Sequence, residues 1–453
     1  MNWKDKTVLV AGSGKSGIGA ADLLKKTGAS VIIYDGNKEL MKEDILSKMQ
    51  DSSHVQVVLG ELPKEIINSS DLMILSPGIA IDAPFVNEVR DAKVPIWGEI
   101  ELAYIIGKGK IAAITGTNGK TTTTALVGEI FNSYYDNVDV VGNIGNPYTT
   151  TAFDSDDNTV TVAEISSFQL ETIHKFKPDV SAVLNITPDH LNRHYTMECY
   201  TDVKMSIAQN QDKNQPVILN YEDSILREYA PKLSNKIIWF SSKQKVEPGV
   251  YLLDKNIMYS DGEKEVFVTT TEDTTLVGIH NLENIMAAIA ISINMNVPVS
   301  NIRESIKRFK AVEHRIEYVE TINNVIYYND SKGTNTDASI KAIEAMSRPT
   351  VLIAGGYDKK VSFDDWADAF GEKIKCLVLL GQTSEQIAET VKKHGFEKII
   401  FTKSLEEAVD VCAKEAEPGD AVLLSPACAS WGMFDNYEQR GDLFKEYVRK
   451  MKK

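Results

Sequence analysis

Short apolar runs alternate with helical patterns along the first part of the chain. The runs at 7–11, 31–34, 55–59 and 72–75 each predict a buried strand. Glycine or polar residues follow these runs, as expected where a strand ends. Strands that alternate with helices are typical of a parallel α/β sheet. We therefore expect residues 1–97 to form one Rossmann-like domain.

The same alternation continues through the rest of the chain. Further strands are predicted at 111–114, 160–163, 180–184, 325–328, 350–354, 376–380, 399–401 and 421–424. Residues 241–275 are rich in Thr, Lys, Glu and Asp and predict a peripheral β excursion, and an apolar helix is predicted at 280–290. The sequence thus predicts an α/β protein of three domains, with a central domain at 98–310 and a C-terminal Rossmann-like domain at 311–453.

The composition argues against nucleic acid and membranes as partners. The formal net charge of the 453 residues is −15, which repels phosphate backbones and anionic lipid. No apolar run approaches the ~20 residues that cross a bilayer, and the first ten residues contain no signal peptide. The four cysteines lack the spacing of metal ligands; they are Cys199, Cys376, Cys412 and Cys428. We expect a cytoplasmic protein in a reducing compartment.

A glycine-rich loop lies between the run at 111–114 and a helical pattern. Its residues are Gly116, Thr117, Asn118, Gly119, Lys120, Thr121 and Thr122. In a phosphate-binding loop the glycines admit backbone N–H groups to the phosphates, the lysine reaches the terminal phosphates, and the next hydroxyl binds Mg²⁺. Ile114 stands where the general motif has its first glycine, so a plain strand–helix turn is the alternative. The flanking strand and helix favour phosphate binding, and with it a P-loop-type ATPase domain at 98–310.

A second glycine-rich loop follows the first predicted strand. Gly12, Gly14 and Gly17 have the spacing of a dinucleotide-binding loop. Asp35 ends the second strand, where it would face a ribose diol. A tight strand–helix turn also requires glycine whatever it binds. A nicotinamide dinucleotide, another nucleotide or sugar nucleotide, and a structural turn therefore all remain open.

Polar side chains follow several later strands. Glu164 ends the run at 160–163, where it is either a metal ligand beside the phosphate loop or an exposed edge glutamate. His190 is either a second metal ligand or a plain loop histidine. Small residues also expose charged side chains in three loops of the last segment, which predicts a substrate rim; the loops lie at 330–335, 355–359 and 425–430.

Several motifs follow one another in a specific order. They lie at 116–122, 142–145, 164–171, 280–284, 313–315 and 329–332. Their order and spacing resemble the Mur ligases, the ATP-dependent amino-acid ligases of peptidoglycan precursor synthesis, and the resemblance runs from residue 7 to about residue 445. Three segments resemble in particular the members that add D-glutamate, namely 76–79, 425–430 and 434–441. The resemblance implies ligation of D-glutamate to UDP-N-acetylmuramoyl-L-alanine through an acyl phosphate.

The same resemblance implies roles for individual residues. Lys120 would contact the β- and γ-phosphates of ATP, Thr121 and Glu164 would hold one Mg²⁺, and His190 would hold a second. Further ATP contacts would come from the 116–122 loop, Asn281, Asn284, Arg315 and Asp330. The UDP substrate would contact Lys15, Ser16, Asp35, Gly78, Asn143 and Gln169. D-Glutamate would contact Thr334, Lys359, Ser430 and Tyr437.

Lys204 has two interpretations. From the local sequence alone it is an ordinary exposed helix lysine. It aligns with a lysine that Mur ligases carry as a carbamate, and the resemblance implies a carbamate on Lys204 that orients the second Mg²⁺. Burial near a metal would favour the neutral amine that reacts with CO₂. The catalytic residues of the expected monomer would be Lys120, Asn143, Glu164, His190 and Lys204.

Two other functions compete with a ligase. A nicotinamide-dependent dehydrogenase would use the 12–17 loop but has no use for a second phosphate loop at 116–122. A nucleotide sensor without activity would not be expected to keep all four of Lys120, Glu164, His190 and Lys204. In the ligase interpretation the 12–17 loop binds the UDP of the substrate, and the two loops serve two different nucleotides.

Overall fold

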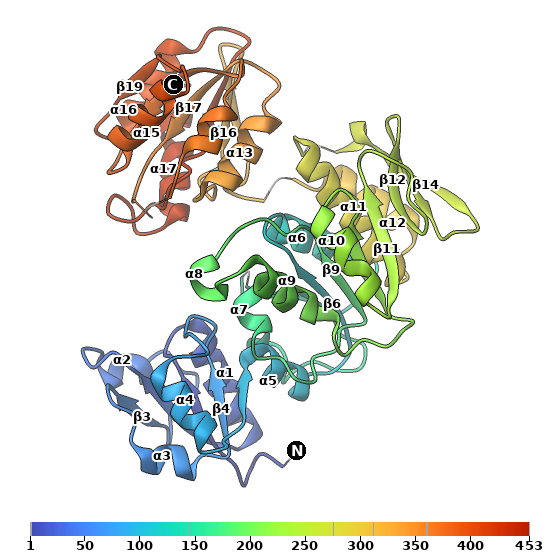
Figure 1. The fold of residues 1–453 in the computed structure, drawn as a ribbon, viewed down its shortest axis with the longest axis vertical. Coiled ribbons are helices and arrows are strands. Elements are labelled where there is room, and N and C mark those ends of the chain that lie inside the picture. Colours follow the sequence, from blue (N-terminus) through green and yellow to red (C-terminus); the bar gives the residue numbers. More distant parts are fainter. Residues whose placement is uncertain (1, 144, 275, 311, 359–360, 453) are drawn as a thin grey trace. The chain divides into compact units, whose positions relative to one another are not determined.

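The structure is a computed structural model, and it describes residues 2–143, 145–274, 276–310, 312–358 and 361–452. Three sheets make up the fold, and Figure 1 shows them in sequence order from blue to red. The chain forms two compact units, of which the first comprises Met1–Asp273 and Glu283–Arg308 and the second Thr274–Leu282 and Phe309–Lys453. The domain boundaries expected near residues 97 and 310 stay predictions.

The first sheet is parallel, with strand order β3-β2-β1-β4-β5. Its strands are β1 (Thr7–Ala11), β2 (Ser30–Asp35), β3 (Gln56–Leu59), β4 (Leu72–Leu75) and β5 (Ile96–Gly98). The helices between them are α1 (Lys15–Thr27), α2 (Lys42–Leu46), α3 (Lys64–Ser69) and α4 (Pro84–Asp91). Leu9 and Ile33 are fully buried on their strands, as the apolar runs require. The predicted Rossmann-like sheet is confirmed.

The second sheet has nine strands in the order β14-β13-β12-β11-β10-β9-β6-β8-β7. They are β6 (Lys110–Thr115), β7 (Val138–Gly142), β8 (Val160–Glu164), β9 (Val180–Val183), β10 (Pro216–Asn220), β11 (Lys236–Ser241), β12 (Gly249–Leu253), β13 (Asn256–Ser260) and β14 (Glu265–Thr270). The strands from β7 to β12 pair in parallel. The last three pair antiparallel, so the predicted β excursion is confirmed as a meander at one edge.

Helices connect the strands of this sheet. The α-helices are α5 (Glu99–Ile106), α6 (Lys120–Asn132), α7 (Ser167–Leu170), α8 (Leu191–His194), α9 (Met197–Met205), α10 (Ser224–Tyr229), α11 (Ile279–Asn294) and α12 (Val299–Arg308). Short 3₁₀ turns lie at Tyr148–Thr150, Ser206–Ala208, Ala230–Lys232 and Thr271–Asp273. Among the described residues, no helix combines the length and the apolar character needed to cross a membrane.

The third sheet lies in the second unit, with strand order β15-β16-β20-β17-β18-β19. Its strands are β15 (Glu317–Ile322), β16 (Val325–Asn329), β17 (Thr350–Ala354), β18 (Ile374–Leu379), β19 (Ile399–Phe401) and β20 (Ala421–Leu424). Only β15 is antiparallel. The helices are α13 (Thr336–Ala345), α14 (Asp364–Asp368), α15 (Ser384–Lys393), α16 (Leu405–Glu415) and α17 (Tyr437–Lys450).

Parallel pairing brings the candidate loops together in each unit. Because β6 and β8 are neighbours, the 116–122 loop and Glu164 leave the second sheet at the same edge. Because β16 and β20 are neighbours, the segments 330–335 and 425–430 leave the third sheet at the same edge. The fold therefore gathers loops that are far apart in sequence at the carboxyl ends of parallel strands.

Candidate active site

The 116–122 loop has the backbone of a phosphate-binding loop. Gly116 and Gly119 have φ angles of +147° and +84°, which favour glycine. A Cβ on Gly119 would lie 2.2 Å from Asn284 Oδ1, and a Cβ on Gly116 would lie 3.0 Å from Leu184 Cβ. Gly119 caps α6, so the N–H groups of the first helical turn begin at Lys120. The loop is thus built for close approach of a ligand to the backbone.

Lys120 is folded onto this loop. Its Nζ donates hydrogen bonds to Gly116 O at 2.9 Å and to Thr117 O at 2.8 Å. Asn185, which follows β9, supports the loop from below, because its Oδ1 accepts from Asn118 N–H at 2.8 Å and its Nδ2 donates to Asn118 O at 3.1 Å. The ammonium group and the helix N-terminus therefore place positive charge at one point.

Glu164 and Asn143 form a polar pair beside the loop. Asn143 Nδ2 donates to Glu164 Oε1 at 2.9 Å. Glu164 is 2% exposed, and its Oε2 has no hydrogen-bond partner among the described residues. A buried carboxylate oxygen without a partner is costly unless a cation binds it. Glu164 and the buried Thr121 hydroxyl at the start of α6 are hard oxygen donors, so these residues fit a Mg²⁺ ion.

A cavity of about 360 Å³ joins the predicted catalytic residues. Its lining includes Gly78, Lys120, Asn143, Phe168, His190 and Lys204. These residues come from the loop after β4, from α6, and from the segments that follow β7, β8 and β9. The first unit therefore brings four of the five predicted catalytic residues to one cavity, and Glu164 contacts the cavity residue Asn143.

Lys204 is buried, which contradicts the interpretation from its local sequence. It is 1% exposed, and its Nζ donates to Gly116 O at 2.8 Å. Tyr200, one helical turn earlier, lies with its ring centroid 4.8 Å from the same Nζ. Burial, together with the charge of Lys120, holds the pKa of Lys204 well below its usual value. A neutral amine at this place is the form that reacts with CO₂.

His190 lies at the start of α8, against an aromatic and charged cluster. Its ring centroid is 4.7 Å from that of Phe168, and its backbone has a φ angle of +52°. Arg193 Nη2 binds Glu171 Oε2 at 2.5 Å and donates to Ile79 O at 2.8 Å. The segment that carries His190 is therefore tied to the 76–79 loop of the first sheet.

His194 stays neutral within the same cluster. Burial, helped by the charge of Arg193, lowers its pKa to about 4. Its Nε2 lies 3.0 Å from Ser167 Oγ, and its ring packs between Phe168 and Tyr200. His194 therefore packs as an uncharged ring next to His190.

Four of the six residues predicted to contact the UDP substrate lie at the carboxyl ends of β1, β2 and β4, whereas Asn143 and Gln169 follow β7 and β8 of the second sheet. Lys15 and Ser16 begin α1. Asp35 Oδ2 accepts from Ser13 N–H at 3.0 Å and from Ser13 Oγ at 2.6 Å. Burial opposes ionisation of Asp35, but the hydrogen bonds from Ser13 and Asn37 outweigh it and lower its pKa. The loop thus presents an ionised carboxylate, and its contact with UDP stays a prediction.

Gln169 is held inside the protein. Its Oε1 accepts from Ser166 N–H at 2.8 Å, and its Nε2 donates to Glu99 Oε1 at 2.8 Å. Glu99 is 1% exposed, and burial raises its pKa. Both polar atoms of the Gln169 side chain are thus already paired, so Gln169 shapes the 166–168 turn at the cavity. Its direct contact with the UDP substrate stays a prediction.

The predicted adenine contacts lie on α11. Asn284 packs against Gly119 in the first unit, as the 2.2 Å approach of a Cβ there shows. Asn281 belongs to the second unit, where its Nδ2 donates to Val277 O at 2.8 Å. Both side chains are buried. Their contact with adenine stays a prediction.

Arg315 and Asp330 lie in the second unit. Asp330 Oδ2 accepts from Ser425 Oγ at 2.7 Å, and Oδ1 accepts from Ile316 N–H at 3.3 Å. Complete burial raises the pKa of Asp330 to about 7, although Ser425 and Arg315 oppose the rise. Arg315 Nε is buried without a hydrogen-bond partner within the described part of the chain. This unpartnered donor fits an anionic ligand such as a phosphate.

The predicted D-glutamate residues also lie in the second unit. Thr334 follows β16, Ser430 follows β20, and Tyr437 begins α17. Ser430 is buried, and its carbonyl accepts from Phe434 N–H at 3.1 Å. Lys359 lies outside the described residues. The set is thus divided over three segments that the third sheet and α17 hold in one unit.

Sequence analysis missed three residues of the first unit. Tyr200 contacts Lys204 and its hydroxyl lies 3.1 Å from Thr117 Oγ1, and the i, i+4 spacing of Tyr200 and Lys204 could have revealed this contact. Arg193 and Glu171 form an ion pair across 22 positions. Such a separation leaves no periodic signal in a single sequence.

Comparison with protein families identifies all three parts of the chain. The model for the Mur ligase MurD-like N-terminal domain matches residues 6–98. The model for the Mur ligase middle domain matches residues 114–292. The model for the Mur ligase glutamate ligase domain matches residues 314–428. The matches stand in the order that the motifs predicted.

Solved structures share the fold at low identity. UDP-N-acetylmuramate-alanine ligase from Thermotoga maritima is 18% identical with a TM-score of 0.61, and the match covers 98% of this chain and 99% of that chain. A pseudomurein peptide ligase type C from Methanothermus fervidus is also 18% identical, with a TM-score of 0.60, covering 99% of this chain and 100% of that one. The predicted α/β fold of Mur ligase type is confirmed.

Curated relatives match over their full length. UDP-N-acetylmuramoylalanine–D-glutamate ligase from Lachnospira eligens is 54% identical over 451 residues, and the enzyme of the same name from Clostridioides difficile is 45% identical over 453 residues. Both matches cover 100% of this chain and 100% of the relative. At this identity and coverage, the chain belongs to the Mur ligases, in the family of UDP-N-acetylmuramoylalanine–D-glutamate ligases.

Proposed function

We propose that this protein joins D-glutamate to UDP-N-acetylmuramoyl-L-alanine at the expense of ATP, in the synthesis of peptidoglycan precursors. The observation that carries the proposal is the cavity in which Lys120 of the phosphate loop, Gly78 of the predicted UDP site and the buried Lys204 meet. A ligase needs a phosphate site and a substrate site that share one space. The active form we propose is a monomer.

The first step is activation of the substrate carboxylate. A carboxylate oxygen attacks the γ-phosphorus of ATP, so that a new P–O bond forms, the bond to the β-phosphate oxygen breaks, and ADP leaves. Lys120 and the N–H groups at the start of α6 offset the negative charge that repels the two reactants. Lys120 Nζ already lies over the loop, so it can exchange its two carbonyl acceptors for phosphate oxygens.

The second step forms the amide. The amine of D-glutamate attacks the acyl phosphate carbonyl, the C–N bond forms, the C–O bond to phosphate breaks, and a proton is released. Arg315 offers its unpartnered Nε to anionic oxygen. Ser430 and Tyr437 would hold the amino acid. The 166–168 turn, fixed by Gln169, shapes the wall of the cavity that excludes water from the acyl phosphate.

Thr121, Glu164, His190 and a carbamate on Lys204 would hold Mg²⁺, which supplies positive charge to the phosphates when bound. The carbamate forms when the neutral Lys204 amine attacks CO₂ and loses a proton. It converts a buried cation into an anion with two oxygen donors. The burial of Lys204 beside Lys120 supports this modification, because two ammonium groups so close to Gly116 O repel each other.

A phosphate-release assay across a panel of amino acids tests the function. With UDP-N-acetylmuramoyl-L-alanine and ATP present, we expect phosphate release with D-glutamate and a product that is heavier by one glutamyl residue. L-Glutamate and D-aspartate serve as controls for configuration and length. Equal phosphate release with all three, or release without any amide product, would overturn the proposal.

A further inference from the structure

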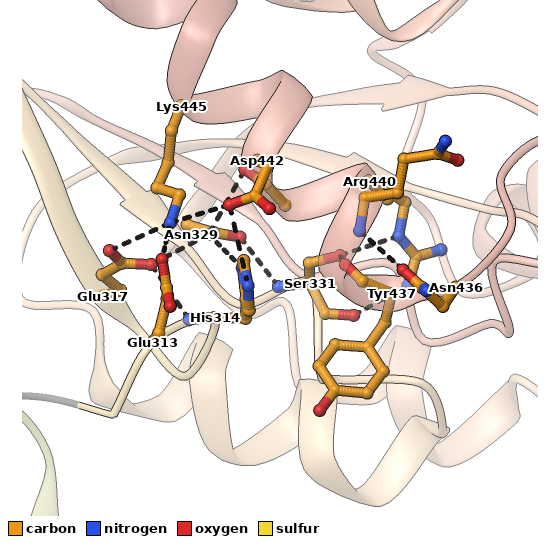
Figure 2. Close-up of polar contacts among 12 residues, drawn as sticks. Glu313, His314, Glu317, Asn329, Ser331, Asn436, Tyr437, Arg440, Asp442 and Lys445 are labelled. Carbon is orange, nitrogen blue, oxygen red and sulfur yellow. Dashed lines mark hydrogen bonds and ion pairs between the residues drawn. The ribbon is translucent and has the colours of Figure 1, made fainter. Parts of the chain in front are cut away.

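Arg440 is a buried cation that binds two loops of the second unit. It lies on α17 and is 2% exposed. Its Nε donates to Ser331 Oγ at 3.0 Å, and its Nη2 donates to Ser331 O at 2.7 Å. Its Nη1 donates to Cys428 O at 3.3 Å. Figure 2 shows this guanidinium beside Ser331 and the first turn of α17. One planar group therefore fixes the segment after β16 and the segment after β20.

Both segments carry predicted ligand residues. Ser331 follows Asp330, which is assigned to ATP, and Cys428 precedes Ser430, which is assigned to D-glutamate. Ser331 Oγ also donates to Tyr437 O at 2.8 Å, so the same contact fixes the start of α17. The position of the Arg440 guanidinium therefore determines where the predicted ATP residues and the predicted D-glutamate residues of the second unit lie.

Tyr437 transmits this position to two further side chains. Its ring lies edge-on to the His314 ring, with centroids 5.9 Å apart. Lys332 Nζ lies 5.4 Å from the centroid of the Tyr437 ring. A shift at the start of α17 would therefore move the aromatic surface that His314 and Lys332 share.

Stability alone does not explain a charge at this place. Among the described residues, Arg440 forms no ion pair with a carboxylate, and burial lowers its pKa to about 10. Apolar residues of similar volume often replace buried charges at no loss of stability. A guanidinium offers something different, namely several N–H donors in one rigid plane. That geometry suits the three acceptors on the two loops.

Lys445, one turn further along α17, is a useful contrast. Its Nζ lies 3.0 Å from Asp442 Oδ1 and 3.6 Å from Glu317 Oε1, and it also contacts Glu313. The cluster of Glu313, His314 and Asp442 could hold a metal ion by its spacing alone. Lys445 already neutralises these carboxylates, as Figure 2 shows, so the cluster is an ion-pair network. Within the described part of the chain Arg440 forms no ion pair, and its guanidinium donates to loop atoms instead.

We propose that Arg440 is a positioning residue. It holds the segment after β16, which carries Asp330, and the segment after β20, which carries Ser430, in fixed positions relative to each other. The inference rests on the proposed ligase function. Arg440 acts through its hydrogen bonds to Ser331 O, Ser331 Oγ and Cys428 O, and it contacts neither substrate itself. Loss of the planar guanidinium therefore weakens the binding of ATP and of D-glutamate by the second unit, and it leaves the UDP substrate site of the first unit unchanged.

Steady-state kinetics of the full chain test the inference. The variants are Arg440→Lys, which keeps the charge but loses the fork, Arg440→Met, and Ser331→Ala, which removes only the shared hydroxyl. We expect the KM for D-glutamate and the KM for ATP to rise about tenfold or more in both Arg440 variants, since small misplacements of binding groups cost this much. The KM for the UDP substrate should stay within about twofold. Ser331→Ala should shift the same two constants in the same direction.

The control is Lys375→Met. Lys375 Nζ pairs with Asp420 at 2.7 Å at the opposite ends of the strands, away from the ligand loops. It should alter thermal stability without altering any KM. In a double variant, Arg440→Lys with Ser331→Ala, the combined effect should be smaller than the sum of the two single effects, because both changes remove the contact between Arg440 Nε and Ser331 Oγ.

The outcomes separate the two ideas. Arg440 and Ser331 variants whose KM values all equal those of the wild type would overturn the positioning role, even if kcat falls through a smaller active fraction. If the Arg440 variants do not fold, Ser331→Ala alone decides: raised KM values for D-glutamate and ATP support the role, and unchanged values reject it. A wild-type enzyme that fails to join D-glutamate to the UDP substrate would instead overturn the proposed function.

Discussion

Replacing Asp330 by asparagine should stabilise the second unit at neutral and alkaline pH. Burial raises the pKa of Asp330 from 3.8 to about 7. Below pH 4 the carboxyl is protonated in both the folded and the unfolded chain. Between pH 4 and 7 the unfolded chain loses this proton while the folded chain keeps it, so the free energy of unfolding falls as pH rises. Above pH 7 the carboxyl is ionised in both the folded and the unfolded chain, and the free energy of unfolding falls no further.

The magnitude follows from the shift. A rise of about three pH units at about 1.36 kcal/mol per unit costs the folded state about 4 kcal/mol above pH 7. Asparagine keeps one oxygen that can accept from the Ile316 N–H, its NH2 group can donate to the Ser425 hydroxyl oxygen in place of the second carboxylate contact, and it carries no charge. The free energy of unfolding of Asp330→Asn, relative to that of the wild type, should therefore rise by about 4 kcal/mol between pH 4 and pH 8. It should lose ATP affinity, if Asp330 contacts the nucleotide.

Hydrogen exchange measures this difference locally. Peptides from β16 and β20 report the opening of the second unit, and comparing the two proteins at each pH cancels the pH dependence of exchange itself. Asp364→Asn is the matched control, because hydrogen bonds from Ser362 and His394 lower the pKa of Asp364. The stabilisation that ionised Asp364 gives the folded protein is present at neutral pH and is lost as pH falls. The pH dependence of this control therefore has the opposite sign to that of Asp330→Asn. A difference between Asp330→Asn and wild type that stays constant from pH 4 to pH 8 would refute the reasoning.

Three further predictions concern the first unit. Lys120→Ala should abolish turnover by removing about 3 kcal/mol or more of transition-state stabilisation, while calorimetry should find the affinity for the UDP substrate within a few-fold; a joint collapse would contradict two separate nucleotide sites. Lys204→Ala should be folded but turn over about 100-fold more slowly than the wild type. Acetate or propionate should restore part of its rate but should not rescue Lys204→Arg. Full activity of Lys204→Ala without additive would exclude a functional carbamate. The UDP substrate at about 100 times its Kd should stabilise the protein by about 2.7 kcal/mol and NAD should not, and micromolar binding of NAD would favour a dehydrogenase.

Apolar runs located most strands correctly where a strand is buried on both faces. The runs at 7–11, 350–354 and 421–424 coincide with β1, β17 and β20, whose residues are almost entirely buried. Sequence analysis did not identify β5, β7, β10, β11 or the antiparallel β15. Only Val319 of β15 is buried, and Glu317 and Glu320 interrupt the apolar pattern. Edge strands of this kind are read less easily because half of their residues face water.

Burial of single charged residues could not be predicted from local sequence. Lys204 stands in a stretch of mixed polarity, Asp202 to Met205, and only the packing of α9 against Gly116 makes it buried. Arg440 stands between Gln439 and Gly441 and would be taken for a surface residue. Both are buried by contacts with residues 88 and 109 positions away. Such long-range contacts leave no periodicity in one sequence, so only the family motif pointed to Lys204.

The buried ionisable groups share one physical property. Lys204, Glu164 and Asp330 each lie at the carboxyl ends of parallel strands or against the loops that leave them, where water is excluded and a charge is costly. Burial shifts the pKa values of Lys204 and Asp330 toward the neutral form, and one oxygen of Glu164 has no hydrogen-bond partner in the described ranges of the chain. Apolar residues at these places would give a more stable fold. In the proposed function these groups gain their full stabilisation when phosphates, cations or CO₂ reach them, which would couple ligand binding to stability at both sites.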